Sequence, residues 1–335
     1  MGKKKTIWFD FTNVPHVNFL NVIIKHFGDK YDYIHSLRDF AETKGLFYQR
    51  IGTDVKVIGT HKGQNKFRKV LGSFIRVLQL YKNIDGFDVK ISVGGDSSSI
   101  VAKLKGKLSI TFDDNEKAPN WRYSKFSDAA FWPSVIDRKI LLKQGFSEKA
   151  IHQYDGFKED FYIADYVPDE AFPQKIPFKD YVVVRPENIQ ANYVEGNASI
   201  VIPLLKSLCS EKINVVFLPR YKSDINYCSQ FKEIFIPEKP LNGLDLVYFS
   251  KAVFTGAGTM AREAACMGIP SFSFYAGKEL LTVDKEMIKK DLLFFSRDAK
   301  ELVDAYKKAK KGKADIHKSK EVKKQIIDQL QDLLK

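Results

Sequence analysis

The chain has 335 residues, enough for two domains that each bury a core of their own. Hydrophobic residues make up 44% and charged residues 28%, and no apolar run approaches the roughly 20 residues that span a bilayer, so the composition is that of a globular protein and excludes a transmembrane one. The net charge of +13 favours polyanions, anionic membranes or phosphorylated substrates as partners. Because no nucleic-acid motif with spaced aromatic residues or paired Cys and His is visible, we expect no nucleic-acid partner.

The N-terminal segment and the cysteines indicate the cellular compartment of the protein. The N-terminal Met-Gly-Lys-Lys-Lys leads directly into a β-type run and lacks the apolar core of a secretory signal peptide. The three cysteines, Cys209, Cys228 and Cys266, show neither paired nor metal-type spacing. These features predict a protein of the reducing cytoplasm.

A buried strand over Thr6–Phe11 and a helix over Val17–Phe27 are predicted to open the chain. Pro15 suits the first helical turn, where a missing N–H costs nothing. Asn13 and His16 are therefore expected at the carboxyl end of the first strand, the edge at which open α/β sheets bind ligands. A histidine at a helix start also fits a surface or capping role, so catalysis is one of two interpretations for His16.

Two further predicted strands end in polar residues. Arg38 opens the helix that follows the strand Asp32–Ser36. Gly95 and Asp96 follow the strand Val89–Val93 in a glycine turn ahead of a short helix. Since the carboxyl ends of parallel strands share one edge of a sheet, these side chains are expected near Asn13 and His16.

A basic amphipathic helix is predicted for Phe67–Tyr81, after a third strand at Val55–Ile58. Such a helix either packs its apolar stripe on the sheet or lies on an anionic membrane. The sequence favours packing on the sheet. The stripe comprises Phe67, Val70, Leu71, Phe74, Ile75 and Leu78.

An acidic cluster follows the strand Leu108–Phe112. Asp113, Asp114 and Glu116 place three carboxylates within four residues, and such crowding raises the pKa of one of them toward neutrality. The cluster is a candidate for general acid or base catalysis, or alternatively an acidic turn that caps the next segment. With another strand at Ala129–Pro133, the alternation of strands and helices predicts a largely parallel, doubly wound sheet.

The second half begins after a proline-rich segment and repeats the alternation. The predicted strand Asp180–Arg185 is followed by Pro186, Glu187 and Asn188, and the strand Val215–Leu218 is followed by Arg220. Arg185 and Arg220 would therefore lie at strand ends, where guanidinium groups can hold phosphates in bidentate geometry.

A strand, a glycine turn and a helix occupy Ala252–Met267, and they are the centre of the functional interpretation. Gly256 and Gly258 leave no Cβ that would hold a ligand off the backbone, and the free N–H groups at the helix start favour an anion such as a pyrophosphate. Glu263, one turn into the helix, could accept hydrogen bonds from ribose hydroxyls. Most such turns merely connect a strand to a helix, so the spacing alone does not establish binding.

Several of these segments together resemble a prokaryotic family, domain of unknown function 354, over nearly the whole length. The segments are Asp10–Phe19, Arg38–Phe40, Gly94–Asp96, Phe112–Glu116, Gly156–Glu159, Val184–Glu187 and Gly256–Glu263. The family is similar to the GT-B clan, which holds nucleotide-sugar glycosyltransferases and the UDP-N-acetylglucosamine 2-epimerases. The resemblance implies an α/β fold of GT-B type, with two Rossmann-like domains whose parallel sheets face a central cleft. The expected limits are 1–166 for an acceptor domain, 167–179 for a linker, 180–311 for a nucleotide-sugar domain and 312–335 for a C-terminal helix that crosses back.

Two departures from the clan's patterns bear on the reaction. The epimerases carry His-Arg-x-Glu-Asn where this chain has Val184-Arg185-Pro186-Glu187-Asn188, and valine can neither donate a hydrogen bond nor carry charge. Many retaining transferases carry a second glutamate eight residues after the first, but the residue eight after Glu263 is Ser271. No Asp-x-Asp triplet occurs in the chain. These differences favour a metal-independent, inverting glycosyltransferase without a cofactor.

The resemblance then implies roles for single residues. The catalytic residues would be His16, Asp114 and Glu116; the nucleotide sugar would be bound by Arg185, Glu187, Asn188, Arg220, Gly256, Ala257, Gly258, Thr259, Met260 and Glu263; the acceptor would be bound by Asn13, Arg38, Gly95 and Asp96. The expected donor is a UDP-sugar, and the expected acceptor is a glycan or a lipid-linked sugar at the inner face of the cell membrane. The alternatives are an epimerase in which Asp114 and Glu116 move the C2 proton, and a non-catalytic nucleotide-sugar-binding protein.

Overall fold

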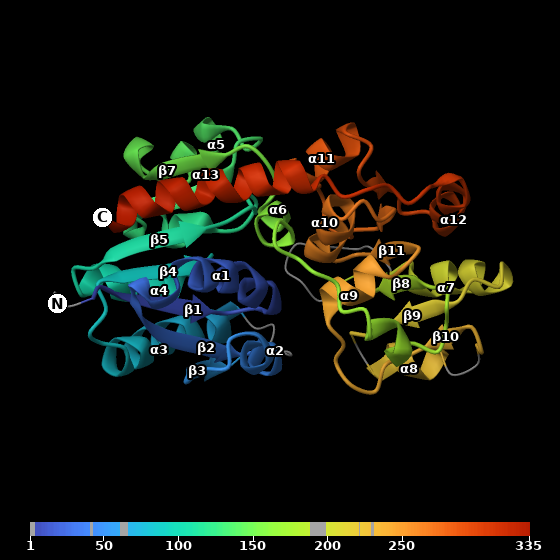
Figure 1. The fold of residues 1–335 in the computed structure, drawn as a ribbon, viewed down its shortest axis with the longest axis horizontal. Helices are drawn as coiled ribbons and strands as arrows, with labels where there is room; N and C mark the ends of the chain where they lie inside the picture. The colour runs from blue at the N-terminus through green and yellow to red at the C-terminus, as the bar shows by residue number, and fades with distance from the viewer. Residues whose placement is uncertain (1–3, 41–42, 61–65, 188–198, 221, 229–230) are drawn as a thin grey trace. The chain divides into compact units, whose positions relative to one another are not determined.

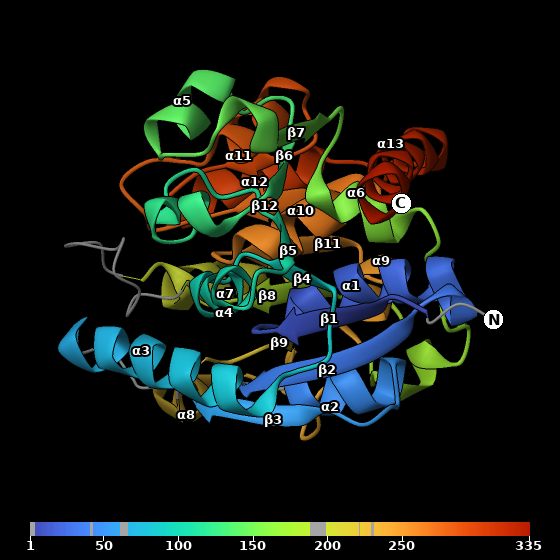
Figure 2. The same ribbon diagram turned by 90° about the vertical axis from the view of Figure 1, so that its left-hand side faces the viewer.

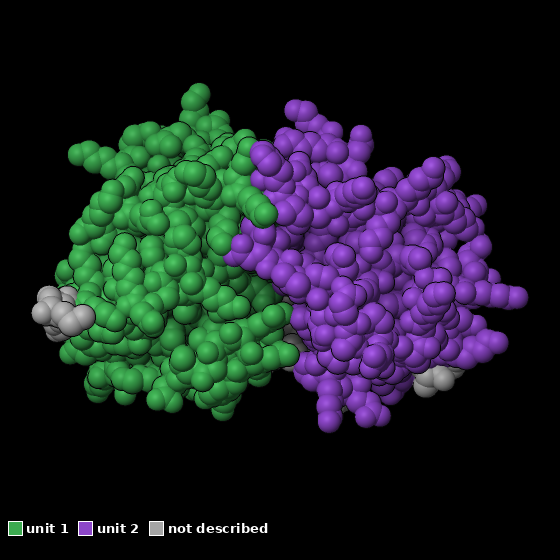
Figure 3. Space-filling model, viewed as in Figure 1, with its two compact units in different colours: residues 1–162, 318–335 green, residues 163–317 purple. Residues whose placement is uncertain are grey.

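The computed structural model describes residues 4–40, 43–60, 66–187, 199–220, 222–228 and 231–335, with the backbone alone at 66–70, 96, 222 and 223. The chain folds into two compact units, residues 1–162 together with 318–335, and residues 163–317 (Figure 3). Each unit is built around a parallel sheet with helices on its faces (Figure 1). The α/β class that the alternation of strands and helices predicts is therefore confirmed. Among the helices that the structure describes, none has the length and apolarity to cross a membrane.

Unit 1 contains a seven-stranded sheet in the order β3-β2-β1-β4-β5-β6-β7. Its strands are β1 (Thr6–Phe11), β2 (Asp32–Asp39), β3 (Lys56–Thr60), β4 (Val89–Val93), β5 (Leu108–Phe112), β6 (Ala129–Pro133) and β7 (Ile151–Tyr154). Its helices are α1 (Val14–Phe27), α2 (Thr43–Arg50), α3 (Lys66–Asn83), α4 (Asp96–Leu104), α5 (Arg138–Lys143), α6 (Lys158–Ile163) and the terminal α13 (Ile316–Leu334), of which Ile163, Ile316 and His317 are assigned to unit 2. β1, β4 and β6 are buried along their whole length, although β1 contains the charged Asp10 and β4 the charged Lys90. Burial on both faces is typical of the strands of a parallel sheet.

The terminal helix α13 packs against unit 1, where it runs beside β7 in Figure 1. Gln329 Nε2 donates to the backbone oxygen of Gln153 in β7 at 3.2 Å, and Ser319 Oγ donates to Asp160 at 2.8 Å. A Cβ at Gly156 would lie only 2.2 Å from Val322 Cγ2, so the absence of a side chain at this glycine lets the helix approach. The chain therefore returns to its first unit after completing the second.

Unit 2 contains a six-stranded sheet in the order β10-β9-β8-β11-β12-β13. Its strands are β8 (Val182–Arg185), β9 (Val215–Phe217), β10 (Ile234–Phe235), β11 (Ala252–Thr255), β12 (Ser271–Ser273) and β13 (Phe294–Phe295). Its helices are α7 (Val201–Ser210), α8 (Lys222–Cys228), α9 (Gly243–Tyr248), α10 (Gly258–Cys266), α11 (Thr282–Lys289) and α12 (Ala299–Lys308). The core is formed by apolar residues of β8, β9, β11 and β12 packed against α7 and α12.

The segment expected as a linker, 167–179, lies within unit 2. It contains a 3-10 helix, Phe172–Lys175, and Phe172 is fully buried with its ring stacked on Phe249 at a centroid distance of 6.1 Å. The hydroxyl of Tyr166 donates to Asp245 at 2.6 Å. Unit 2 begins at Ile163, so it includes the last residues of the expected first domain, 1–166, and the whole of the expected linker, in which Phe172 packs instead of remaining in solvent.

The apolar stripe of α3 does not pack on the sheet, and the preferred sequence interpretation is wrong there. Leu71, Phe74 and Leu78 are 59%, 60% and 47% exposed. The opposite face of the helix meets the protein through Arg76 and Leu80, which are both buried. Phe67 and Val70 lie among the residues whose side chains are not described.

Strand order reverses once in each sheet, between β1 and β4 in unit 1 and between β8 and β11 in unit 2. At such a reversal the connections leave in opposite directions and open a crevice at the carboxyl ends of the strands. Open α/β sheets bind their ligands at this point. Each unit therefore has one position at which a ligand site is expected, and these two positions guide the description below.

Candidate functional site

The reversal in unit 2 brings the turn after β11 against the loop after β8. Thr255 pairs with Arg185 in parallel register, and the N–H of Gly256 donates to the backbone oxygen of Arg185 at 3.1 Å. A Cβ at Gly256 would lie 2.6 Å from Glu187 Cα and 2.5 Å from Glu187 Cγ. The absence of a Cβ at Gly256 therefore makes room for the loop after β8, whereas the sequence predicts that it makes room for a ligand.

The head of α10 presents backbone N–H groups. Ala257 is the N-cap and its own N–H donates to Thr255 Oγ1 at 2.9 Å. Gly258 and Thr259 are half-buried, and within the described part of unit 2 no recorded hydrogen bond uses their backbone N–H groups. The first N–H groups of a helix have no partner inside the helix, and together with the helix dipole they favour an anion.

Arg262 lies beside this helix start. A Cβ at Gly258 would be 2.8 Å from Arg262 Nη1, so the guanidinium runs along the first turn of α10. Asp284 of α11 holds the same nitrogen at 2.9 Å in a buried ion pair. The remainder of α10 is enclosed, including Met260 and Glu263, which are 6% and 7% exposed.

Glu187 is committed to protein partners. Its carboxylate accepts hydrogen bonds from Ser199 Oγ at 2.6 Å, from the N–H of Ile200 at 3.1 Å and from Arg297 Nη1 at 2.7 Å. With three donors around a side chain that is 1% exposed, Glu187 positions the loop after β8. Its contacts offer no direct support for the nucleotide-binding role expected of it.

The two predicted arginines lie at that same loop. Arg185 is the last residue of β8 and is half-buried. Arg220 follows β9 and its Nε donates to the backbone oxygen of Pro186 at 2.7 Å. The structure thus brings Arg185, Arg220 and the Gly256 turn together at the strand ends, and Asn188 lies outside the described residues.

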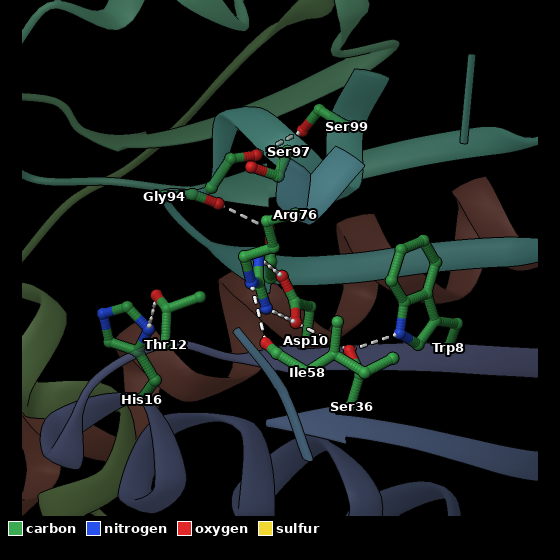
Figure 4. A network of polar contacts seen from close by, with 12 residues as sticks. Trp8, Asp10, Thr12, His16, Ser36, Ile58, Arg76, Gly94, Ser97 and Ser99 are labelled. Atoms are coloured by element: carbon green, nitrogen blue, oxygen red, sulfur yellow. Dashed lines mark hydrogen bonds and ion pairs between the residues drawn. The ribbon is translucent and has the colours of Figure 1, made fainter. Parts of the chain in front are cut away.

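His16 occupies the first turn of α1 at the reversal point of unit 1. Its Nδ1 lies 3.1 Å from Thr12 Oγ1 (Figure 4). Burial and the nearby Lys158 ammonium lower the pKa of His16 to about 3, against the smaller opposing effects of the Asp10 and Asp114 carboxylates. The imidazole is therefore neutral at physiological pH and close enough to Asp114 to interact with it electrostatically.

The acidic turn after β5 divides into two kinds of carboxylate. Asp113 accepts the N–H groups of Asp114 and Asn115 at 2.8 and 3.0 Å, together with the Tyr123 hydroxyl at 2.6 Å. Burial and the adjacent Asp114 charge raise the pKa of Asp113. Asp114 instead forms a buried ion pair with Lys158 at 2.8 Å. Asp113 thus organises the turn, as the capping interpretation predicts, and Asp114 pairs with the first residue of α6, so a catalytic role for the cluster stays a prediction.

The remaining predicted residues differ in position. Glu116 is buried, and its backbone oxygen accepts from Gln144 Nε2 at 2.5 Å. Asn13 is an exposed N-cap whose side chain accepts the N–H of Val14. Gly95 has φ +102°, a left-handed conformation that suits glycine. Asp96 begins α4, but its side chain is not described.

Arg38 does not open a helix, and that prediction is wrong. β2 extends to Asp39, so Arg38 belongs to the strand, and α2 begins only at Thr43. The strand is longer than predicted because its last residues continue to pair with the edge strand β3 across a register shift between Leu37 and Asp39.

Sequence reasoning missed a buried ion pair at the end of β1. Asp10 is fully buried and accepts two hydrogen bonds from Arg76 of α3, at 2.7 and 3.0 Å, and one from Ser36 Oγ at 2.6 Å (Figure 4). Burial alone would raise the pKa of Asp10, but Arg76 and the hydroxyl donors hold it below its ordinary value. An aspartate inside an apolar strand already implies a partner, although the sequence does not say which.

Among the residues that the structure describes, no group of three or more His, Cys, Asp and Glu side chains is arranged to hold a metal ion. The cations near the two reversal points are guanidinium and ammonium groups, and three of them are paired within their own unit, Arg76 with Asp10, Lys158 with Asp114 and Arg297 with Glu187. The arrangement can hold an anion in unit 2 and can transfer a proton through a histidine or a carboxylate in unit 1.

Comparison with known proteins agrees with this architecture. An uncharacterized protein of Methanocaldococcus jannaschii is 28% identical over 313 residues, which covers 89% of each chain. The UDP-GlcNAc 2-epimerase of Methanocaldococcus jannaschii, solved in complex with UDP-GlcNAc and UDP, superposes with a TM-score of 0.72 at 15% identity, over 97% of this chain and 99% of that one. A UDP-N-acetylglucosamine 2-epimerase from Rickettsia bellii gives 0.70 at 13% identity over 99% and 97%. The glycotransferase of kitacinnamycin gives 0.62 at 9% identity over the whole of both chains.

At these low identities the solved structures establish the fold, which is that of the GT-B type, and they leave the reaction open. The family is established independently, because the model of the family described as protein of unknown function (DUF354) matches residues 5–335. The resemblance to this family that the sequence motifs indicate is therefore confirmed, and this chain belongs to the DUF354 family.

Proposed function

We propose that this chain is an enzyme acting on a nucleoside diphosphate sugar, in the first place a UDP-sugar, and that it is an inverting glycosyltransferase without a metal requirement. The acceptor is a glycan or a lipid-linked sugar at the cytoplasmic face of the membrane. Unit 2 binds the donor, and unit 1 provides the groups that act on the acceptor.

The observation that carries the proposal is the turn at the reversal point of the second sheet. The N–H groups of Gly258 and Thr259 lie at the head of α10, just after Thr255, which pairs with Arg185 at the end of β8. A diphosphate at this position gains from the helix dipole and from guanidinium donors. The leaving nucleoside diphosphate accumulates negative charge during sugar transfer, and fixed donors of this kind stabilise such charge.

Two groups of unit 1 are candidates for the base that removes the acceptor proton. His16 is neutral, so a ring nitrogen has a lone pair for the proton, but a pKa of about 3 makes it a weak base. Asp114 would have to exchange its 2.8 Å contact with Lys158 for the acceptor hydroxyl. We expect His16→Ala and Asp114→Asn to separate the two, since removal of the true base lowers kcat by about 100-fold or more with little change in donor affinity.

Donor binding is tested first. A ligand that binds only the folded state raises the apparent melting temperature. A thermal-shift series with UDP, GDP, CMP and dTDP and with the corresponding nucleotide sugars therefore identifies the nucleobase and the sugar of the donor. Gly258→Val, which places a branched side chain at the head of α10, is expected to abolish the shift. A wild-type shift in this variant, or no shift with any nucleotide, would refute donor binding at α10.

A 2-epimerase-like activity is the second candidate. In the turn after β5, Asp113 has a raised pKa while its neighbour Asp114 is paired with Lys158, and two carboxyl groups in different environments are suited to removing and returning a proton. The solved epimerases of the same fold, one of them with UDP-GlcNAc bound, also favour this reaction. Incubation with UDP-GlcNAc in deuterated water without acceptor discriminates, because only the epimerase reading predicts deuterium at C2.

A further inference from the structure

Helix α3 carries an exposed apolar stripe on the side that faces away from the sheet. Leu71, Phe74, Leu78 and Tyr81 are each between 46% and 60% exposed. Their spacing of three, four and three residues places them on one face of the helix. Such a continuous stripe of large side chains is unusual for a surface that meets only water.

The helix is fixed in this orientation by its opposite face. Arg76 Nη1 and Nη2 bind Asp10 of β1, and Arg76 Nε donates to the backbone oxygen of Ile58 in β3 at 3.1 Å (Figure 4). Leu80 on the same face is fully buried. Figure 2 shows α3 lying alongside β3 of the same unit. A rotation that buried the stripe would withdraw Arg76 and leave Asp10 buried without its cation, which is strongly unfavourable.

The charge around the stripe is mainly positive. Residues 55–84 contain seven Lys and Arg and no Asp or Glu, and one of the seven, Arg76, is paired with Asp10 inside the protein. Lys82 lies exposed near the end of α3. Lys105 Nζ lies 4.7 Å from the centroid of the Tyr81 ring and 3.3 Å from Asp85, the first acidic residue after this segment. The partner of this face must therefore accept large apolar side chains and carry negative charge.

A second copy of the chain does not meet both conditions. In a symmetric dimer the same surface meets itself, so two positively charged stretches would face each other. A lipid surface rich in anionic headgroups meets both, because it takes apolar side chains into the boundary with the acyl chains and attracts lysine and arginine electrostatically. We propose that the outer face of α3 docks this protein on an anionic lipid bilayer.

Membrane docking rests on the proposed function in one respect, because a lipid-linked acceptor lies at such a surface. Binding of the protein to lipid vesicles can nevertheless be measured without any substrate. Asp10, which Arg76 binds, is the last but one residue of β1 and lies two residues before Thr12, the hydrogen-bonding partner of His16. The docked helix is thus attached directly to the strand end at which we place acceptor chemistry.

The test is cosedimentation of the full chain with phosphatidylcholine vesicles, with and without phosphatidylglycerol. The variant Leu71→Ser/Phe74→Ser/Leu78→Ser is compared with Leu142→Ser/Val167→Ser/Ile202→Ser, a control that removes three exposed apolar side chains elsewhere. We expect the wild type and the control to bind anionic vesicles and to lose binding in high salt. The α3 variant is expected to bind about 100-fold more weakly, as the loss of three partly inserted apolar side chains implies.

Three outcomes would overturn the docking proposal: binding of the α3 variant equal to the wild type, equal binding to neutral vesicles, or a dimer in sedimentation velocity that the α3 substitutions dissociate. The thermal shift with UDP-sugars is recorded on the same samples. If docking fails while this shift persists, the donor proposal stands. If the shift is absent while vesicle binding persists, the donor proposal fails and the docking surface stands.

Discussion

The packing of Gly256 against Glu187 gives the sharpest test of the donor site. In Gly256→Ala the new Cβ would lie 2.6 Å from Glu187 Cα, against an ordinary contact of 3.4 Å or more. The obstacle is backbone, so a rotamer change cannot relieve it. The turn after β11 and the loop after β8 must separate by about 0.8 Å.

This separation acts on both stability and binding. Overpacking of this kind costs about 1–3 kcal/mol of unfolding free energy. The same displacement stretches the 3.1 Å hydrogen bond from the Gly256 N–H to the backbone oxygen of Arg185. It therefore moves Arg185 away from the turn that leads into α10. If the donor diphosphate needs both elements, loss of about 1.4 kcal/mol of binding energy corresponds to a tenfold weaker Kd.

Urea denaturation and calorimetric titration with UDP measure the two effects. Gly243→Ala in the same unit is the matched control, because a Cβ at Gly243 meets nothing within 4 Å and stability should change by less than about 1 kcal/mol. Gly256→Ala with wild-type stability would show that the predicted clash is absent. Reduced stability with wild-type UDP affinity would refute the position of the donor between these two elements.

Three further substitutions test the electrostatics and packing of unit 1. The pKa of His16 is about 3 in the folded protein against 6.5 ordinarily. Between these pH values the unfolded chain binds one proton more than the folded chain, so the free energy of unfolding falls as the pH drops from 7 to 4. In urea titrations His16→Gln should remove on the order of 2 kcal/mol of that fall. Burial lowers the pKa of Lys90 to about 7 from 10.5, so wild-type stability should rise between pH 7 and 10, and Lys90→Met should flatten this rise in thermal melts. Gly156→Ala places a Cβ 2.2 Å from Val322 Cγ2 and should cost about 1–3 kcal/mol, and adding Val322→Ala should recover part of that loss in a double-mutant cycle.

The strands that the sequence predicts best are those whose signal is local. β1, β4, β5, β6 and β11 have the predicted limits because each is a mostly apolar run that ends at a turn. β7 was not predicted, since its central residues His152 and Gln153 are polar and only half-buried. Gln153 is held by Gln329 of α13, 176 residues further on, and no local pattern contains that information.

The orientation of α3 could not be predicted from the sequence, because it too depends on a contact between residues that are distant along the chain. Periodicity identifies an apolar stripe but does not say which side of the helix meets the protein. In this chain Arg76 decides, because it pairs with Asp10, 66 residues earlier. The helix therefore turns Arg76 inward and the stripe of Leu71, Phe74 and Leu78 outward, the reverse of the preferred sequence interpretation.

The candidate site was predictable in position and only partly in detail. The strand ends follow from the alternation of strands and helices, and both glycine turns lie at the reversal points of their sheets. The separate environments of Asp113 and Asp114 depend on Tyr123 and Lys158, which lie on later segments. A run of adjacent carboxylates in the sequence does not indicate which of them binds the tyrosine hydroxyl and which binds the lysine.

Charge explains why the diphosphate is assigned to unit 2 and the proton transfer to unit 1. At the reversal point of unit 2, Arg185 ends β8 and Arg220 Nε donates to the backbone oxygen of Pro186, so two guanidinium groups belong to the loop region beside β11, and Glu187 is paired with Arg297. At the strand ends of unit 1, the cations Arg76 and Lys158 are matched by Asp10 and Asp114, and Asp113 adds a further carboxyl group. A diphosphate placed there would meet carboxylates whose cations are already paired, whereas an acceptor hydroxyl would meet groups able to take its proton. The two sheets share one order of strand reversal, and the different charges at their reversal points are the reason for proposing that unit 2 binds the diphosphate and unit 1 the acceptor.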